Sequence, residues 1–219
     1  MRVELLDFFG GDDNHVNVAR VSYGKEASNY TEEQNSRLLK YLVNHGHTSP
    51  FRHSTLQFRI KCPIYVERQL FKHQIGISVN SISGRYVDFS DTYSTIRYGD
   101  WRKQSKSSKQ GSEGLLDKEG QRLANNIQSE VELLARESYK KLIDLGVARE
   151  QARSILPLNL ETEFIWTGSF LAFVHLCNLR LKEDTQKETG DIVKEMLREV
   201  KGLDSFKETL KAFGYGEEY

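Results

Sequence analysis

The chain has 219 residues, with 31 basic and 31 acidic side chains that balance to a formal net charge of zero. This length suits one domain, residues 1–219, and the balanced charge argues against a global field that recruits nucleic acid or a membrane surface. Two cysteines are too few for a disulfide framework, and the N-terminus lacks the pattern of a signal peptide. The longest apolar segment, 164–177, is too short to span a membrane. We therefore expect a cytoplasmic protein that holds any anionic ligand through local side chains.

The first segments of the chain carry clear local signals. Residues 3–9 are β-prone and precede a Gly-Gly-Asp-Asp-Asn turn, and a short helix fits residues 16–21. Thr31 and Gln34 have the spacing of a capping box, and the apolar stripe after them predicts a helix to about residue 45.

A strand, a helix and a polar stretch come next. Apolar and polar residues alternate from 56 to 62, which predicts a half-buried strand, and Pro63 suits the first turn of a helix over 64–74. Residues 72–86 combine short polar side chains with two glycines, a composition suited to holding a ligand. An extended pattern resumes at 86–89.

The second half of the chain is mainly helical in pattern. Residues 101–114 are polar and basic, which is typical of a mobile surface loop, and we place no chemistry there. A helix is predicted from about 118 to 146, and a polar helix from 149 to 156. Residues 159–181 predict one very apolar helix, buried against several neighbours or other subunits, before two amphipathic closing helices. Strands early and helices late indicate an α+β fold.

Several side chains are candidates for ligand binding. Ser83, Gly84 and Arg85 supply a hydroxyl, an accessible backbone amide and a planar guanidinium, which together suit a phosphate. The alternative, a capped loop whose serines satisfy only backbone groups, stays open. Arg153 and Arg180 lie on or beside apolar helices, where an arginine either pairs with an acid or reaches into a ligand site.

The histidines do not predict a metal site. No Cys, Asp or Glu stands at ligand spacing from His45, His47 and His53, so turn packing or ligand contact is favoured there. His175 lies in the apolar segment 159–181 and is expected to be a core histidine bonded to a backbone carbonyl. Neither cysteine has the context of a nucleophile.

These motifs together resemble the flavin-dependent thymidylate synthases, a family that methylates dUMP without a catalytic cysteine. Lys72-His73-Gln74, followed after eight residues by Ser83-Gly84-Arg85-Tyr86, resembles the family's Arg-His-Arg and Ser-x-Arg-Tyr signature. Other blocks keep the family's order along the chain: Ala19-Arg20-Val21-Ser22, residues 45–51, Val66-Glu67-Arg68-Gln69, Ala152-Arg153, residues 156–159 and Asn178-Leu179-Arg180.

The resemblance implies a fold, a cofactor and an assembly. The fold is an α/β domain in which a mixed β-sheet is flanked by helices, assembled as a homotetramer with sites shared between subunits. The cofactor is FAD, the co-substrates are NADPH and methylenetetrahydrofolate, and the substrate is dUMP.

The resemblance also implies roles for individual residues. The dUMP-binding set is Gln69, Ser83, Gly84, Arg85, Arg153 and Arg180. The FAD-binding set is Ser22, Ser49, Lys72, His73, Gln74, Ile75, Ser81, Ser169 and His175. Catalytic roles fall to Arg180, which would stabilise charge on the uracil ring, to Ser83 as a binding hydroxyl, and to His47 near the flavin.

Some positions depart from the family pattern. Lys72 and Gln74 replace two arginines, so a planar fork becomes a point charge and a second cation is lost, which is expected to weaken binding of flavin or folate anions. Ser81 stands where relatives usually carry glutamate. Two other functions stay open: hydroxymethylation of a pyrimidine nucleotide on the same fold, and nucleotide binding by a tetramer without catalysis.

Overall fold

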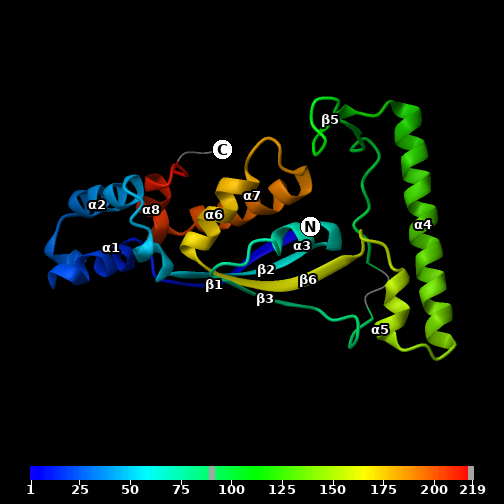
Figure 1. Ribbon diagram of the computed structural model, residues 1–219, viewed down its shortest axis with the longest axis horizontal. Coiled ribbons are helices and arrows are strands. Elements are labelled where there is room, and N and C mark those ends of the chain that lie inside the picture. Colours follow the sequence, from blue (N-terminus) through cyan, green and yellow to red (C-terminus); the bar gives the residue numbers. More distant parts are fainter. Residues whose placement is uncertain (89–91, 217–219) are drawn as a thin grey trace.

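The computed structural model describes residues 1–88 and 92–216, which form an α+β fold (Figure 1). The strands are β1 (Arg2–Phe9), β2 (Thr55–Pro63), β3 (Ile77–Ser81), β4 (Arg102–Gln104), β5 (Ser112–Leu115) and β6 (Glu161–Ser169). The helices are α1 (Asp12–Arg20), α2 (Glu32–Asn44), α3 (Ile64–Leu70), α4 (Lys118–Asp144), α5 (Arg149–Ala152), α6 (Phe170–Arg180), α7 (Lys187–Lys201) and α8 (Lys207–Ala212).

The main sheet has the strand order β1-β2-β6-β3, and every neighbouring pair is antiparallel. β2 and β3 run in the same direction, but β6 lies between them, so they do not pair with each other. The expected mixed sheet is therefore wrong for the described part of the chain, whereas the expected α+β class is confirmed. Figure 1 shows α6 and α7 on one face of this sheet.

Residues 159–181 contain a strand and a helix, not the single helix predicted. In β6 the buried residues alternate with more exposed ones, and Thr162, Phe164 and Trp166 face the core. This period of two is that of a strand with one buried face. α6 follows directly and is buried almost all round, so the two elements read as one continuous apolar run. The expected burial of the segment against several neighbours is confirmed.

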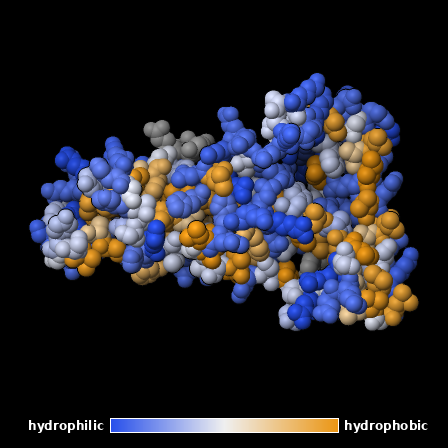
Figure 2. Space-filling model, viewed as in Figure 1, coloured by the Kyte–Doolittle hydropathy of each residue, from blue (hydrophilic) through white to orange (hydrophobic). Residues whose placement is uncertain are grey.

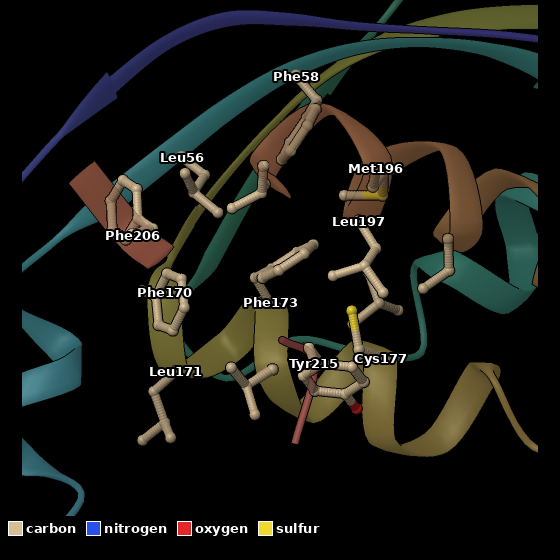
Figure 3. Close-up of a cluster of buried hydrophobic side chains, with 14 of the residues drawn as sticks. Leu56, Phe58, Phe170, Leu171, Phe173, Cys177, Met196, Leu197, Phe206 and Tyr215 are labelled. Atoms are coloured by element: carbon tan, nitrogen blue, oxygen red, sulfur yellow. The ribbon is translucent and has the colours of Figure 1, made fainter. Parts of the chain in front are cut away.

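The core lies between the sheet and α6 and α7 (Figure 3). The Phe58 ring on β2 lies 5.9 Å from Trp166 and 6.3 Å from Phe173 of α6, measured between ring centroids. Gly168 sits directly opposite Leu56, and a Cβ atom on it would lie 2.5 Å from the Trp166 ring. Only glycine fits there. Truncating a buried ring such as Phe58 to alanine costs about 3–5 kcal/mol of stability.

Several local predictions are confirmed, although some helices and strands end at other residues than expected. The Thr31 hydroxyl accepts from the Gln34 backbone N–H at 3.3 Å, and the Gln34 side chain accepts from the Thr31 N–H at 3.0 Å, so the capping box forms. α3 ends at Leu70, four residues earlier than predicted. Of the segment expected to be extended, Tyr86 lies in a turn and Phe89 lies outside the described residues.

The segment expected to be an irregular loop, residues 101–114, forms a hairpin in which β4 and β5 pair antiparallel. The Gln104 side-chain amide donates to the backbone carbonyls of Ser108 and Gly111, at 3.2 and 3.0 Å, and so holds the hairpin loop closed. Among the described helices, none is both long and apolar enough to cross a membrane.

A buried histidine joins three distant segments of the chain. His15 of α1 is fully buried; its Nδ1 lies 2.9 Å from the hydroxyl of Thr209 in α8, and its Nε2 bonds the Ser54 hydroxyl before β2. The Thr209 hydroxyl also donates to the Asp12 carboxylate at 2.5 Å. Burial, together with the nearby His53, lowers the pKa of His15 to about 4. The imidazole is therefore neutral in the folded protein at neutral pH.

We predict that this histidine makes the fold sensitive to acid. The folded-state pKa of His15 is about 4, below its ordinary 6.5, so the unfolded chain binds the proton more tightly. The contribution of neutral His15 to the free energy of unfolding is fully present above pH 6.5. As the pH falls to about 4, the free energy of unfolding decreases by on the order of 3 kcal/mol. Urea unfolding at a series of pH values measures this loss. His15→Gln should flatten the dependence, whereas the matched control His45→Gln, at an exposed position, should not. An unchanged slope in His15→Gln would contradict the prediction.

Candidate functional site

The C-terminal ends of α3 and α6 meet at Arg180. Its Nε donates to Nε2 of His73 at 3.0 Å, and its terminal nitrogen donates to the backbone carbonyl of Gln69 at 3.1 Å. Two bonds to one planar guanidinium fix its orientation. Since Nε2 of His73 is an acceptor, this imidazole is neutral and carries its proton on Nδ1.

A cavity of about 710 Å³ opens beside Arg180 and Gln69. Its other walls come from the start of α7 and from the β4–β5 hairpin, through residues such as Arg102, Gln104 and Gln186. Residues 101–114, where no chemistry was expected, thus form one side of the candidate site through the hairpin. The described lining is rich in groups that donate or accept hydrogen bonds, which suits a polar ligand.

A chain of hydrogen bonds connects the hairpin to Gln69. Arg102 donates to one carboxylate oxygen of Glu188 at 2.7 Å, and the Gln186 amide donates to the other at 3.0 Å. The Gln186 oxygen accepts from the Gln69 amide nitrogen, and the Thr189 hydroxyl donates to the Gln69 amide oxygen at 3.2 Å. Sequence reasoning missed these partners, because Arg102 lies 86 residues from Glu188 and Gln69 lies 117 residues from Gln186, and such distant pairs show no local pattern.

A second group of candidate residues forms a tight turn after β3. The Ser83 hydroxyl accepts from the Arg85 backbone N–H at 3.3 Å, and Arg149 of α5 donates to the Tyr86 carbonyl at 3.1 Å. The Arg85 Nε lies 3.7 Å from a carboxylate oxygen of Glu150, and both side chains are more than half exposed. An exposed pair at this distance is weak, so Arg85 stays available to a ligand.

The substrate-binding residues implied by the resemblance thus fall into two groups. Arg153 opens the 3-10 turn directly after α5, the helix that holds Arg85 and Tyr86, and its side chain is exposed. Gln69 and Arg180 line the 710 Å³ cavity, whereas Ser83, Gly84, Arg85 and Arg153 do not. A single copy of the chain does not combine both groups in this cavity.

The turn between α3 and β3 carries four of the residues expected to bind FAD. Lys72, Gln74 and Ile75 are exposed, and Ile75 is 93 % exposed. His73 is half-buried, and burial together with Arg180 and His175 lowers its pKa. The exposed Ile75 offers apolar surface and the exposed Lys72 offers a cation on the same turn, and this combination fits a flat aromatic ring that carries phosphate groups.

Two residues of α6 and its N-cap adjoin this turn. Gly76 has a φ of +74°, and its carbonyl accepts from the Ser169 N–H at 3.0 Å, so the turn closes against the cap of α6. The Ser169 hydroxyl accepts from the Ala172 N–H at 3.2 Å, which commits it to capping the helix. His175 is exposed, so the expected core histidine is wrong: its position on α6 faces away from the sheet.

The remaining expected residues lie on the α1–α2 side of the molecule (Figure 1). The Ser22 hydroxyl donates to the Ala19 carbonyl at 3.3 Å, and Ser49 begins a 3-10 turn. His47 is exposed, with its ring 6.0 Å from Tyr41. The structure does not bring these residues to the Arg180 cavity. No cluster of three metal-ligating side chains occurs among residues 1–88 and 92–216.

Ser81 contacts a carboxylate although its own side chain is short. Its hydroxyl donates to Glu67 of α3 at 3.1 Å, and Thr162 lies 3.5 Å from the same oxygen. Burial raises the pKa of Glu67. A carboxyl group therefore stands beside position 81, supplied by α3.

Neither thiol is available as a nucleophile. Cys62 and Cys177 are fully buried in the core. Burial raises the pKa of Cys62 to about 12 and raises that of Cys177 further. The thiolate form is absent near neutral pH, which confirms the expectation from sequence.

Comparison with known proteins gives consistent matches over most of the chain. Residues 4–204 match the family described as "Thymidylate synthase complementing protein". The chain is 41 % identical over 200 residues to the flavin-dependent thymidylate synthase of Thermus thermophilus, covering 91 % of this chain and 71 % of that one. It is 40 % identical over 193 residues to the enzyme of the same name from Kosmotoga olearia, covering 85 % and 79 %.

A solved structure also matches the fold. The UMP/dUMP methylase PolB from Streptomyces cacaoi, bound with 5-Br dUMP, superposes with a TM-score of 0.86 at 27 % identity. The match covers 97 % of this chain and 94 % of PolB.

We predict that Arg180 holds the pKa of His73 below its ordinary value of 6.5. Burial is the largest cause, and electrostatic interactions with Arg180 and with His175 lower the pKa of His73 further. Arg180→Gln should therefore raise the pKa of His73 toward 6.5, as measured by NMR titration of histidine ring carbons. Arg153→Gln removes an arginine of the other group and should leave that pKa unchanged. Equal shifts in both variants would show that the Arg180–His73 contact is absent in solution.

Proposed function

Because the chain belongs to the family of flavin-dependent thymidylate synthases, we propose that it converts dUMP to dTMP, with FAD as cofactor and NADPH and methylenetetrahydrofolate as co-substrates. The observation that carries the proposal is Arg180, held by His73 and Gln69 at the wall of a polar cavity while both thiols are buried. A mechanism based on a cysteine nucleophile is closed to this chain. Activation of the pyrimidine therefore falls to charge and orientation.

Each group of arginines has a distinct task. Arg85 and Ser83 suit the phosphate of dUMP, since a guanidinium fork and a hydroxyl are strong partners of phosphate oxygens. Arg180 suits the uracil ring, where its fixed positive charge stabilises the negative charge that develops as C5 becomes nucleophilic. Arg153 joins Arg85 from the turn after α5.

FAD, once reduced by NADPH, supplies the hydride that completes the methyl group. The residues proposed to hold it are Lys72, His73, Gln74, Ile75, Ser81, Ser169 and His175, with Ser22, Ser49 and His47 contributed from the α1–α2 side. Lys72 would neutralise the pyrophosphate of FAD as a point charge, and Ile75 would exclude water from the flavin ring.

We propose that the active site is shared between subunits of a homotetramer. The two arginine groups lie apart in one chain, so a second copy brings them together. α4 carries an apolar stripe at helical spacing, Leu123, Ile127, Val131 and Leu134, and each of these side chains is about half exposed or more. Figure 2 shows hydrophobic side chains along the outer edge of the molecule at α4. Burying the exposed part of each side chain contributes about 1 kcal/mol to association.

The proposal includes the setting in which the enzyme works. We infer that residues 1–219 act as one domain in the cytoplasm, since two free buried thiols fit a reducing compartment. The partners are small molecules and other copies of the chain, without nucleic acid or membrane.

The purified chain with FAD, NADPH and methylenetetrahydrofolate should convert dUMP to dTMP, detected by mass analysis of the product. Arg85→Ala should raise the KM for dUMP, because it removes a phosphate contact, and Arg180→Ala should lower kcat by about 10²–10³. Arg198→Ala removes an exposed arginine on α7 and is the matched control.

Three results would change the assignment. A product heavier by one oxygen favours the hydroxymethylase. Binding of dUMP without turnover or NADPH oxidation favours the non-catalytic tetramer. A folded protein that neither binds flavin nor forms dTMP refutes the proposed function.

A charge placed in the α4 stripe should dissociate the tetramer. Val131→Glu puts a carboxylate where the proposed interface excludes water, at a cost of several kcal/mol per copy. We expect smaller particles by light scattering, with loss of activity and an intact helical circular dichroism spectrum. The control Glu137→Gln changes a charge elsewhere on α4 and should leave the assembly intact. A variant that stays tetrameric and active would place the interface elsewhere.

A further inference from the structure

The Gln69 side chain is held at both ends of its amide. Its nitrogen donates to the Gln186 oxygen, and its oxygen accepts from the Thr189 hydroxyl at 3.2 Å. A carboxamide has two N–H donors and two acceptor lone pairs. One donor and one acceptor are therefore left on a side chain that lines the cavity and whose orientation is already fixed.

Glu188 decides which end of the Gln186 and Gln69 amides faces which hydrogen-bond partner. Burial acts to raise the pKa of Glu188, but the hydrogen bond from Arg102 and other contacts lower it overall, so the group is an ionised carboxylate. A carboxylate only accepts hydrogen bonds, so Gln186 must turn its nitrogen to Glu188 and its oxygen to Gln69. Gln69 must then present its nitrogen to Gln186.

The side chains in this series of hydrogen bonds are shielded from water. Thr189 is fully buried, and the side chains of Arg102 and Glu188 are only 26 % and 15 % exposed. Turning either amide over would set oxygen against oxygen or N–H against N–H, leaving buried groups unpaired at about 1–3 kcal/mol each. The amide orientation of Gln69 is thus strongly fixed.

A neutral amide with one free donor and one free acceptor suits a nucleobase edge. Uracil presents an N3–H donor beside an O4 acceptor, whereas cytosine presents an N3 acceptor beside an amino donor. A freely turning amide can match either base by rotating through half a turn, but a fixed amide matches only one. Arg180, which only donates, also favours the carbonyl-rich edge of uracil.

We propose that the hydrogen-bonded chain Arg102–Glu188–Gln186–Gln69, with Thr189, makes this site select uracil nucleotides over cytosine nucleotides. The proposal rests on the proposed function, since it takes a pyrimidine nucleotide as the ligand of the cavity. Gln69 contacts the base; Glu188, Gln186, Thr189 and Arg102 are positioning residues that act through it. Selectivity therefore depends on a carboxylate that does not touch the substrate.

The test compares dUMP and dCMP binding to the full chain loaded with FAD, by titration calorimetry. Glu188→Gln keeps the side-chain shape but can donate as well as accept, so the direction of the chain is no longer fixed. We expect the ratio of the dCMP to the dUMP dissociation constant to fall by about tenfold or more. Thr189→Val, of similar volume, should lower the ratio in the same way and serves if Glu188→Gln does not fold.

Glu195→Gln is the matched control, since it makes the same change in another Arg–Glu pair of α7, with Arg198. The control should keep the wild-type ratio. The inference is overturned if both test variants keep that ratio, or if the wild type binds dUMP and dCMP equally. Formation of dTMP by the wild type, assayed in parallel, judges the proposed function separately from this selectivity.

Discussion

The pairing of β2 with β6 is the constraint on which the rest of the structure depends. Nine residue pairs, from Thr55 opposite Ser169 to Pro63 opposite Glu161, fix the register. α3 starts directly after β2, and α6 starts directly after β6, so this register also decides where both helices run. Their C-terminal ends meet, and Arg180 contacts Gln69 and His73 there. A slip of one residue would turn Phe58 and Trp166 out of the core and separate these groups.

The candidate site has two parts, a rigid group around Arg180 and Gln69 and an exposed group around Arg85 and Arg153. His73 and the Gln69 carbonyl fix the Arg180 side chain, and Gln186 and Thr189 fix the Gln69 side chain, which suits recognition of a planar base. The side chains of Arg85 and Arg153 are exposed, and Arg85 is only weakly paired. This suits binding of the phosphate of a nucleotide whose base is held by a second copy of the chain. The exposed apolar stripe on α4 is the surface through which we propose that copies of the chain associate.

Local signals in the sequence predicted the elements that depend on neighbouring residues. The capping box of α2, the alternation of β2 and the long stripe of α4 all formed as expected. The largest error concerned β6, whose alternation was hidden because Ile165 joins Phe164 and Trp166 into a continuous apolar run and α6 adds more apolar residues after the strand. The prediction that His175 is buried was wrong for a related reason, because an apolar segment does not indicate which of its faces is exposed to solvent.

The sequence by itself determined the family, and it predicted the types of the ligand-binding residues and their order along the chain. It could do so because these depend on short motifs such as Ser83-Gly84-Arg85 and on the absence of a usable thiol. Only the tertiary structure decided that Gln69 is held by α7, that Arg102 reaches Glu188, and that the arginines form two groups. Such contacts join residues 80 to 120 positions apart, and they depend on how helices pack against the sheet rather than on any local pattern.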